Sequence, residues 1–289
     1  MRLICIVSDK DNLCNPDTYR LLGIAAQDKN IEFVTIESAK ADVGAMSDFE
    51  IKRGDLLYRL GIDHDSTFAE ALLLRNGIAN LYRVNDGLFA RAFNWGSVIK
   101  MNNAGINIIP THFSVSNDEQ VLLKNVEVVG GFPVVLKSSG GSHGSGVKLA
   151  NSLVELREAA MDLRAKNPAG RLVLRKFISN ARHIRCVVID DKVVDAIEYL
   201  PVANDFRTNA INEPLVKPFI YDDAVFKLAE NAVKTQLTEF GGVDILVDER
   251  GDAYVAEINF PCNFARNQMC TGVNIAGMII DRLIDKAKR

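Results

Sequence analysis

The stretch GVDILVDERGDAYVAEIN, residues 242–259, constrains the fold of this chain more than any other segment. Apolar residues typical of β-structure predict strands at 243–248 and 253–259, and the turn signal Arg250-Gly251 lies between them. Two strands joined by such a turn form a hairpin. The sequence therefore predicts an antiparallel pair of strands near the end of the chain.

Centring the hairpin on that turn gives three opposed pairs, which are Asp248 with Ala253, Leu246 with Val255, and Asp244 with Glu257. The carboxylates of Asp244 and Glu257 would then have Cβ atoms about 5 Å apart, and like charges so placed are destabilising unless a cation compensates them. Alternation places Asn259 on the same face, and this all-oxygen set suits Mg²⁺ or Mn²⁺. We therefore expect a metal site at Asp244, Glu257 and Asn259, with Asp244→Asn stabilising the metal-free hairpin; the alternative is a solvated face that carries two carboxylates.

A second segment, VVLKSSGGSHGSGVKLA, places four glycines between β-type runs at 133–137 and 147–150. Backbone N–H groups of such a loop can approach phosphate oxygens closely. Because a second strand precedes the helix expected at 153–165, we expect a hairpin lid over a nucleotide rather than a Walker loop; the alternative is an ordinary flexible hairpin. Lys137, just before it, could reach the phosphates, or could be a solvated lysine at a strand end. His143 in the lid could touch a ligand or be solvated.

The rest of the chain predicts an α/β (α+β) fold. Strands are expected at 2–7, 31–36, 54–60 and 79–82. Helices are expected at 16–28, at 68–77, in a further stretch that ends at about residue 104, at 222–239 and at 273–287. We expect three units: an N-terminal α/β domain over 1–95, a central subdomain with the glycine lid over 96–172, and a C-terminal subdomain with the metal site over 173–289.

Bulk properties exclude several classes of protein. A net charge of −3 gives no overall reason to bind nucleic acid or an anionic membrane. The first apolar run is too short for a signal peptide, and about 18 consecutive apolar residues occur nowhere. The five cysteines lack C-x₂-C spacing, so a reducing, cytoplasmic location is expected. A homo-oligomer remains open.

Together, Lys137, the glycine hairpin, the Asp244 hairpin and the closing E-x-N strand resemble the ATP-grasp superfamily. Within it, the chain looks most like the ribosomal-protein glutamate ligase branch, over about residues 131–277. Further motifs that carry the resemblance are IRCVVIDDKVVDAIE, DFRTN, GVDIL and TGVNIAG. The resemblance implies an ATP-grasp fold behind an N-terminal pre-ATP-grasp domain, with ATP and Mg²⁺ or Mn²⁺ as cofactors.

The resemblance also assigns roles. Metal binding would fall to Asp244, Glu257 and Asn259, and the catalytic arginines would be Arg207 and Arg185. The residues implied in nucleotide binding are Lys137, Gly140, Gly141, Ser142, His143, Gly144, Gly146, Lys176, Phe177, Ile178, His183 and Asn209.

The sequence departs from the family pattern at several positions. Asn94 stands where an early lysine is usual, the adenine hinge reads Arg175-Lys176-Phe177, and His183 stands at the position of the acid that binds ribose. The family's SPG after the metal strand is replaced by Phe260-Pro261-Cys262, which indicates a rebuilt acceptor side.

The preferred function is therefore an ATP-dependent carboxylate-amine ligase that forms an amide bond through an acyl phosphate, acting on an amino acid or peptide. Two alternatives remain. One is an ATP-grasp phosphotransferase, since the same phosphate cradle serves both reactions. The other is a nucleotide-binding regulatory module with reduced catalysis.

Overall fold

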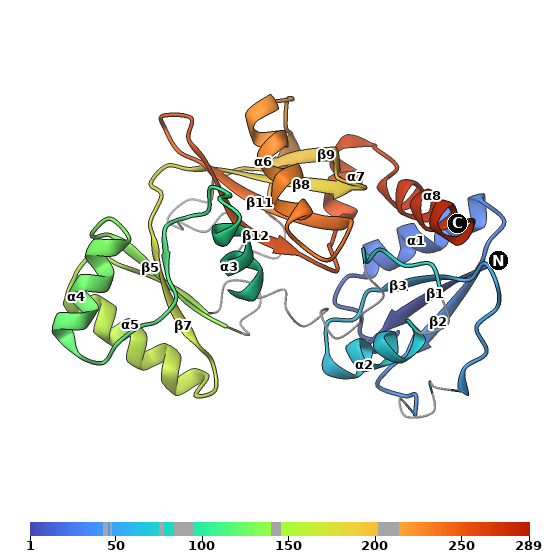
Figure 1. The fold of residues 1–289 in the computed structure, drawn as a ribbon, viewed down its shortest axis with the longest axis horizontal. Helices are drawn as coiled ribbons and strands as arrows, with labels where there is room; N and C mark the ends of the chain where they lie inside the picture. Colours follow the sequence, from blue (N-terminus) through green and yellow to red (C-terminus); the bar gives the residue numbers. More distant parts are fainter. Residues whose placement is uncertain (43–45, 47, 75–77, 84–94, 140–145, 202–213) are drawn as a thin grey trace.

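The computed structural model describes residues 1–42, 46, 48–74, 78–83, 95–139, 146–201 and 214–289. Its described strands form three sheets that follow one another along the chain (Figure 1). We call the parts built on these sheets the N-terminal, central and C-terminal units. Our division at residues 95 and 172 stays a prediction, and its second boundary falls inside a strand of the central sheet.

The N-terminal unit contains three parallel strands in the order β2-β1-β3. Its elements are β1 (Arg2–Val7), α1 (Pro16–Asp28), β2 (Glu32–Glu37), β3 (Leu56–Arg59) and α2 (His64–Leu73). The continuous apolar run of β1 suits a strand that is paired on both edges and buried. The final helix of the chain, α8 (Ile275–Ala287), packs against α1 and β3 (Figure 1).

Two predictions for this unit are wrong in detail. Residues 79–82 make isolated bridges instead of a strand, from Ala79 to the N-terminal sheet and from Tyr82 toward the C-terminal unit. The helix expected at 68–77 begins at His64, because the Asp63 carboxylate accepts a hydrogen bond from a backbone N–H of its first turn and caps it.

The central unit is a four-stranded antiparallel sheet in the order β4-β7-β5-β6. Its elements are β4 (Thr111–His112), α4 (Glu119–Val128), β5 (Val134–Ser138), β6 (Val147–Ala150), α5 (Leu153–Lys166) and β7 (Leu172–Lys176). Val134 and Leu136 of β5 point into the core shared with α4 and α5. Lys137 therefore points to the opposite face of the sheet.

The C-terminal unit is a five-stranded antiparallel sheet in the order β10-β9-β8-β11-β12. Its elements are β8 (Arg182–Ile189), β9 (Lys192–Tyr199), β10 (Val216–Pro218), α6 (Asp223–Lys234), β11 (Phe240–Val247), β12 (Ala253–Asn259) and α7 (Ala265–Thr271). The helix expected at 222–239 ends at Lys234, and the strand expected from 243 begins at Phe240. Helix α6 covers one face of the sheet, and α3 (Trp95–Asn103) packs beside β12.

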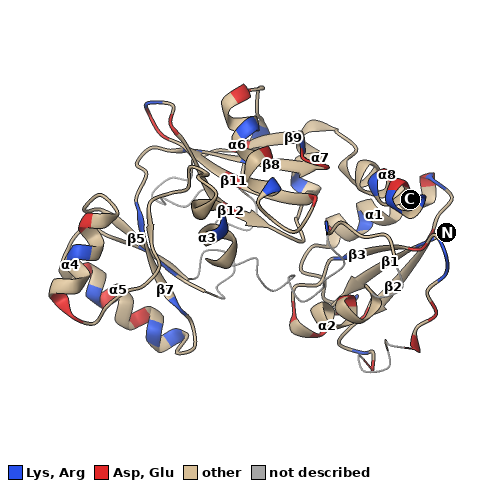
Figure 2. Cartoon of the chain, viewed as in Figure 1, with Lys and Arg blue, Asp and Glu red and all other residues tan. Residues whose placement is uncertain are grey.

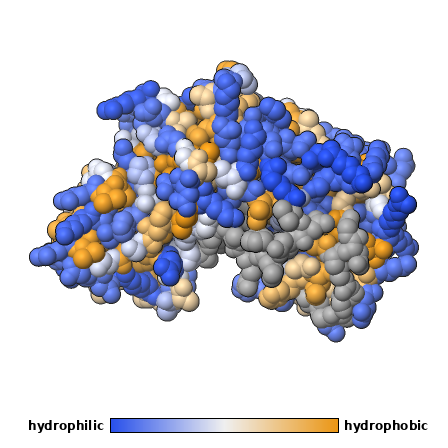
Figure 3. Space-filling model, in the orientation of Figure 1, coloured by the Kyte–Doolittle hydropathy of each residue, from blue (hydrophilic) through white to orange (hydrophobic). Residues whose placement is uncertain are grey.

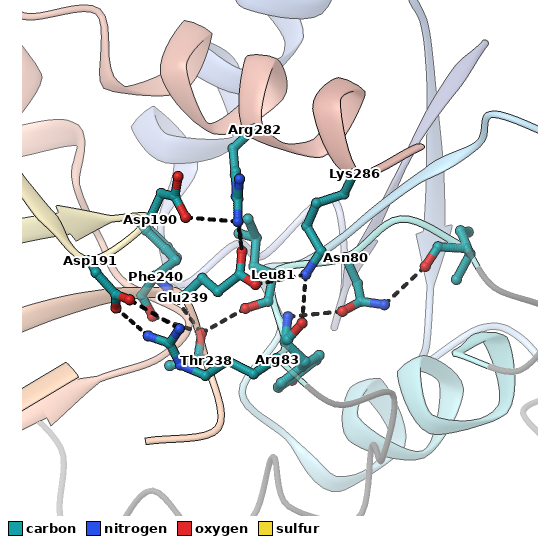
Figure 4. Close-up of polar contacts among 12 residues, drawn as sticks. Asn80, Leu81, Arg83, Asp190, Asp191, Thr238, Glu239, Phe240, Arg282 and Lys286 are labelled. Atoms are coloured by element: carbon teal, nitrogen blue, oxygen red, sulfur yellow. Dashed lines mark hydrogen bonds and ion pairs between the residues drawn. The ribbon is translucent and has the colours of Figure 1, made fainter. Parts of the chain in front are cut away.

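A polar network joins the N-terminal and C-terminal units. Figure 4 shows Arg282 and Lys286 of α8 reaching Glu239, which immediately precedes β11. Arg282 also pairs with Asp190 at 2.7 Å, and Lys286 donates to the carbonyl of Tyr82. These contacts hold α8 against both units.

The surface carries charges of both signs on all three units (Figure 2). The space-filling view is hollowed along the edge between the central and N-terminal units (Figure 3). In the described residues no helix has the length and apolar character needed to cross a bilayer.

Candidate functional site

The β11–β12 hairpin confirms the pairing of Asp244 with Glu257. Beyond that pair the register shifts by one residue, so Ile245 faces Val255, and the predicted pairs Leu246–Val255 and Asp248–Ala253 are wrong. A bulge therefore follows the carboxylate pair, and a five-residue connection, 248–252, closes the hairpin.

The strands of the C-terminal sheet align site residues in rows. Reading from β9 to β12, the first row is Tyr199, His183, Leu246 and Tyr254, the second is Ile197, Arg185, Asp244 and Glu257, and the third is Asp195, Val187, Gly242 and Asn259. These rows alternate with apolar residues that pack in the core under α6. They therefore lie on the opposite face.

Asp244 is buried, with 2% of its side chain exposed, and is surrounded by donors. Arg185 donates from Nε at 2.8 Å and from Nη2 at 2.6 Å. Asn259 Nδ2 donates at 2.9 Å, and His183 Nε2 lies 3.2 Å away. Burial alone would raise the pKa of Asp244, but the charge of Arg185 and the hydrogen bonds hold it well below its usual range.

Glu257 receives its partner from the other sheet. Lys137 reaches across from β5 and places its Nζ 2.5 Å from Glu257 Oε2. The charge of Lys137 lowers the pKa of Glu257 more than burial and Asp244 raise it. Both carboxylates are thus compensated by cations of the chain itself, so the expected unbalanced repulsion in the metal-free hairpin is wrong.

The donors nevertheless fit a hard divalent cation. Asp244, Glu257 and Asn259 converge from paired strands and supply carboxylate and amide oxygens. Among the described residues, no three His, Cys, Asp or Glu side chains are grouped to hold an ion. Since Mg²⁺ binds through one or two carboxylates plus substrate phosphates, this set suits a metal that arrives with a nucleotide. The assignment of these ligands stays a prediction.

Arg175 connects the two sheets. It is 5% exposed, donates from Nε to Thr111 Oγ1 at 3.1 Å, and donates from Nη2 to the carbonyl of Ala256, the bulged residue, at 3.0 Å. Burial lowers the pKa of Arg175 to about 10. Arg175 therefore fastens β7 to β12.

The predicted hinge residues Lys176, Phe177 and Ile178 line a common pocket of about 270 Å³. Tyr254 and residues 248–250 and 252 of the hairpin connection form its other side. Tyr254 belongs to the row of His183, one row away from the carboxylates. The predicted hinge residues and the hairpin connection therefore share one open, mainly polar pocket.

The structure does not reach every predicted site residue. Gly140, Gly141, Ser142, His143, Gly144, Arg207 and Asn209 lie outside the described residues. Gly146 is described, and its carbonyl accepts a hydrogen bond from the backbone N–H of Ser138. The strands β5 and β6 pair as predicted on either side of the loop.

Sequence reasoning missed two contributors to the site and the contact of a third. Tyr199 stacks on His183 with ring centroids 4.6 Å apart. Trp95 lies beside Lys137 and Arg175. Cys262, noted only as part of a replaced segment, packs under Gly242, where an added Cβ would lie 2.4 Å from its sulfur. Of the two missed residues Trp95 gave a signal, since it is the sole tryptophan of the chain and directly follows Asn94.

Comparisons with known proteins identify the family of the chain. The pattern that defines the RimK-like ATP-grasp domain matches residues 73–283. A ribosomal protein bS6–L-glutamate ligase of Escherichia fergusonii is 33% identical over 178 residues, which are 61% of this chain and 58% of that protein. The chain thus spans little more than half the length of that relative.

Two solved structures share the fold over nearly the whole chain. The ATP-grasp ligase PsnB, complexed with minimal precursor, Mg and ADP, has a TM-score of 0.70 and 15% identity, covering 99% of this chain and 98% of that one. The D-alanine–D-alanine ligase of Bacillus anthracis complexed with ATP has a TM-score of 0.73 and 20% identity, covering 100% and 97%. The chain has the ATP-grasp fold throughout, and it belongs to the RimK-like ATP-grasp family.

Proposed function

We propose that this protein is an ATP-dependent ligase that joins a carboxylate to an amine. The observation that carries the proposal is the charged row Arg185–Asp244–Glu257, completed by Lys137 from the facing sheet. Two cations and two carboxylates at the junction of two sheets form a site that suits a polyphosphate and its metal ion.

Asp244, Glu257 and Asn259 would hold Mg²⁺, which neutralises charge on the phosphoryl group as it moves. Lys137, which pairs with Glu257 in this structure, would pair with the nucleotide phosphates when Glu257 holds the metal ion. A substrate carboxylate oxygen attacks the γ-phosphorus while the bond to ADP breaks, which gives an acyl phosphate. The amine attacks the acyl carbon, phosphate leaves with the bonding electron pair, and the amine loses a proton.

Arg185 donates two hydrogen bonds to the predicted metal ligand Asp244. Its guanidinium lies in the row of the carboxylates, with 13% of the side chain exposed. From there it orients Asp244 and supports negative charge on the transferred phosphoryl group. We assign the companion role to Arg207 and the nucleotide contacts to the glycine lid by the family resemblance.

The substrates we propose are amino acids or peptides. One relative is named for ligating L-glutamate to a ribosomal protein, and PsnB is complexed with a precursor. The replaced segment Phe260-Pro261-Cys262 follows the metal strand, so the acceptor of this chain differs from that of the relatives.

The test is a screen of amino acids and peptides for ADP release with ATP and Mg²⁺, followed by mass measurement of the product. An amide product that is 18 Da lighter than the summed substrates supports the ligase. Glu257→Gln should lower its turnover about a hundredfold or more, because it removes one metal charge at nearly constant shape. A phosphorylated product without amide indicates the phosphotransferase, and ATP binding without ADP release indicates the regulatory module.

A further inference from the structure

The sole tryptophan of the chain lies at the charged junction between the central and C-terminal sheets. Trp95 is the first residue of α3, and α3 packs beside β12, the strand that carries Glu257. Its indole Nε1–H is buried and has no hydrogen-bond acceptor in the described part of the chain. A buried donor without an acceptor costs free energy, so the position calls for an explanation.

Two cations lie against the same indole ring. Lys137 Nζ is 5.5 Å from the ring centroid, and the Arg175 guanidinium carbon is 5.9 Å from it. Both side chains leave the same face of the central sheet, because Arg175 pairs with Val135 and Lys137 lies two residues further along β5. Cation–π contacts of this length attract each cation to the face of the indole ring.

The two cations differ in what fixes them. Arg175 is tied to Thr111 and to the backbone of Ala256, whereas the ion pair of Lys137 within the described residues is with Glu257, beside its contact with the indole ring. If Glu257 holds a metal ion, Lys137 would need another anion, and a phosphate of the nucleotide would supply it. That phosphate would lie beside the indole.

We propose that Trp95 is a nucleotide-binding residue of this protein: its N–H donates a hydrogen bond to a phosphate oxygen, and its ring keeps Lys137 directed at the same phosphate. This inference rests on the proposed function in one respect, which is that the bound ligand is a nucleotide. It explains the buried donor, because a phosphate oxygen supplies the acceptor that the described residues do not.

The first experiment uses the unaltered protein and its intrinsic fluorescence, because Trp95 is the sole tryptophan. Saturation with Mg²⁺ and ADP should change the emission and should protect it from acrylamide quenching by about twofold or more. Unchanged emission and unchanged quenching, at a concentration where calorimetry shows saturation with the same ligand, would overturn the inference.

The second experiment removes the donor. Trp95→Phe keeps an aromatic face for the cations but loses the N–H, so the Kd for Mg²⁺-ADP measured by calorimetry should rise about tenfold. Tyr221→Phe is the matched control, since it takes one polar group from an exposed ring, and its Kd should stay within twofold. A Trp95→Phe protein that binds as tightly as the control contradicts the proposal. Thermal melting verifies folding, and if the variant does not fold, the quenching measurement decides.

The two proposals fail separately. A change in Trp95 emission on nucleotide binding, without any amide product in the substrate screen, leaves this inference standing and defeats the ligase. If an amide forms but the Trp95 emission does not change on nucleotide binding and the Kd of Trp95→Phe is unaltered, the ligase stands and this inference is wrong.

Discussion

Asp244 is held by Arg185, Asn259 and His183, so its charge is balanced before any metal arrives. Taking a carboxylate and a guanidinium out of water is costly, and only their mutual attraction and good hydrogen-bond geometry offset the cost. The two hydrogen bonds from Arg185 supply that geometry. Removing one member leaves the other buried and unpaired.

Asp244→Asn should therefore destabilise the metal-free protein by about 3–5 kcal/mol, the range for breaking a buried ion pair. Chemical denaturation followed by circular dichroism measures the change. Asp223→Asn is the control, because the pair of Asp223 with Lys227 is exposed and solvent screens it, so its loss should change stability far less. A stabilised Asp244→Asn protein would mean that repulsion from Glu257 outweighs the pairing with Arg185.

At the scale of single residues, the sequence predicts which carboxylates come together better than it predicts which cations compensate them. Two-residue alternation and one turn suffice to bring Asp244, Glu257 and Asn259 together. Their compensation depends on contacts between distant segments, since Lys137 is 120 residues from Glu257. No local pattern encodes such a contact, which is why the sequence indicated repulsion where the structure has balance.

Among the elements, the β11–β12 hairpin has one feature, its bulge, that the local sequence pattern does not predict. The strands and the central pair are confirmed, but the bulge is set by other segments, through the bond from Arg175 to Ala256 and the backbone bonds of Asn107 and Ile109 with Val255. The bulge shifts pairing by one residue on the turn side only. The carboxylate pair was therefore predictable, although the pairs on its turn side were not.

Close packing at Gly242 gives a prediction for β11. A Cβ there would lie 2.4 Å from Cys262 Sγ, so Gly242→Ala should cost about 1–3 kcal/mol in stability through overpacking. Cys262→Ala removes the sulfur, and the double variant should lose at least about 1 kcal/mol less than the summed single variants. Additive losses in denaturation experiments would show that the two residues do not clash.

The cap of α2 predicts a dependence on pH. Partial burial acts to raise the pKa of the Asp63 carboxyl, but hydrogen bonds from Ser8 and Ser66 outweigh it and lower the pKa to about 2. A lowered pKa means that the stability contribution is complete above the unfolded value of about 4 and is lost as pH falls toward 2.

Asp63→Asn should consequently remove up to about 2 kcal/mol of the acid-induced loss of stability between pH 4 and pH 2. The amide can still cap the helix, so the comparison isolates the titration. Denaturant midpoints measured at pH 7, 4 and 2 check it. Parallel pH profiles for the two proteins would place the pKa of Asp63 at its ordinary value.

At the scale of the whole molecule, the path of the chain brings its first and last segments together. After the C-terminal sheet the chain returns as α8 to the N-terminal sheet (Figure 1), so the first and last segments share one core. The sequence predicted α8 as a helix but not its docking site, since an apolar helical stripe does not specify which sheet covers it. The network around Glu239 settles that choice by charge.

Glu239 is the hub of that network, since its carboxylate takes Arg282 at 2.9 and 2.7 Å and Lys286 at 3.2 Å (Figure 4). Its side chain is 11% exposed, so solvent screens these pairs weakly. Glu239→Gln would take its described carboxylate partner from the partly buried Lys286 and leave Arg282 with Asp190, and we expect a loss of about 2–4 kcal/mol. Because the pairs join two units, calorimetric unfolding should also broaden or divide into two transitions.

The matched control is Glu230→Gln, whose carboxylate meets the exposed Lys192 at 3.5 Å and should matter by less than about 1 kcal/mol. If Glu239→Gln unfolds like this control, in one transition at the unaltered temperature, the apolar core around α8 alone holds the units together. A divided transition would instead show that charge at Glu239 couples the N-terminal sheet to the sheet that carries Asp244. The site would then depend on a contact outside it, because the segment from Glu239 leads directly into β11.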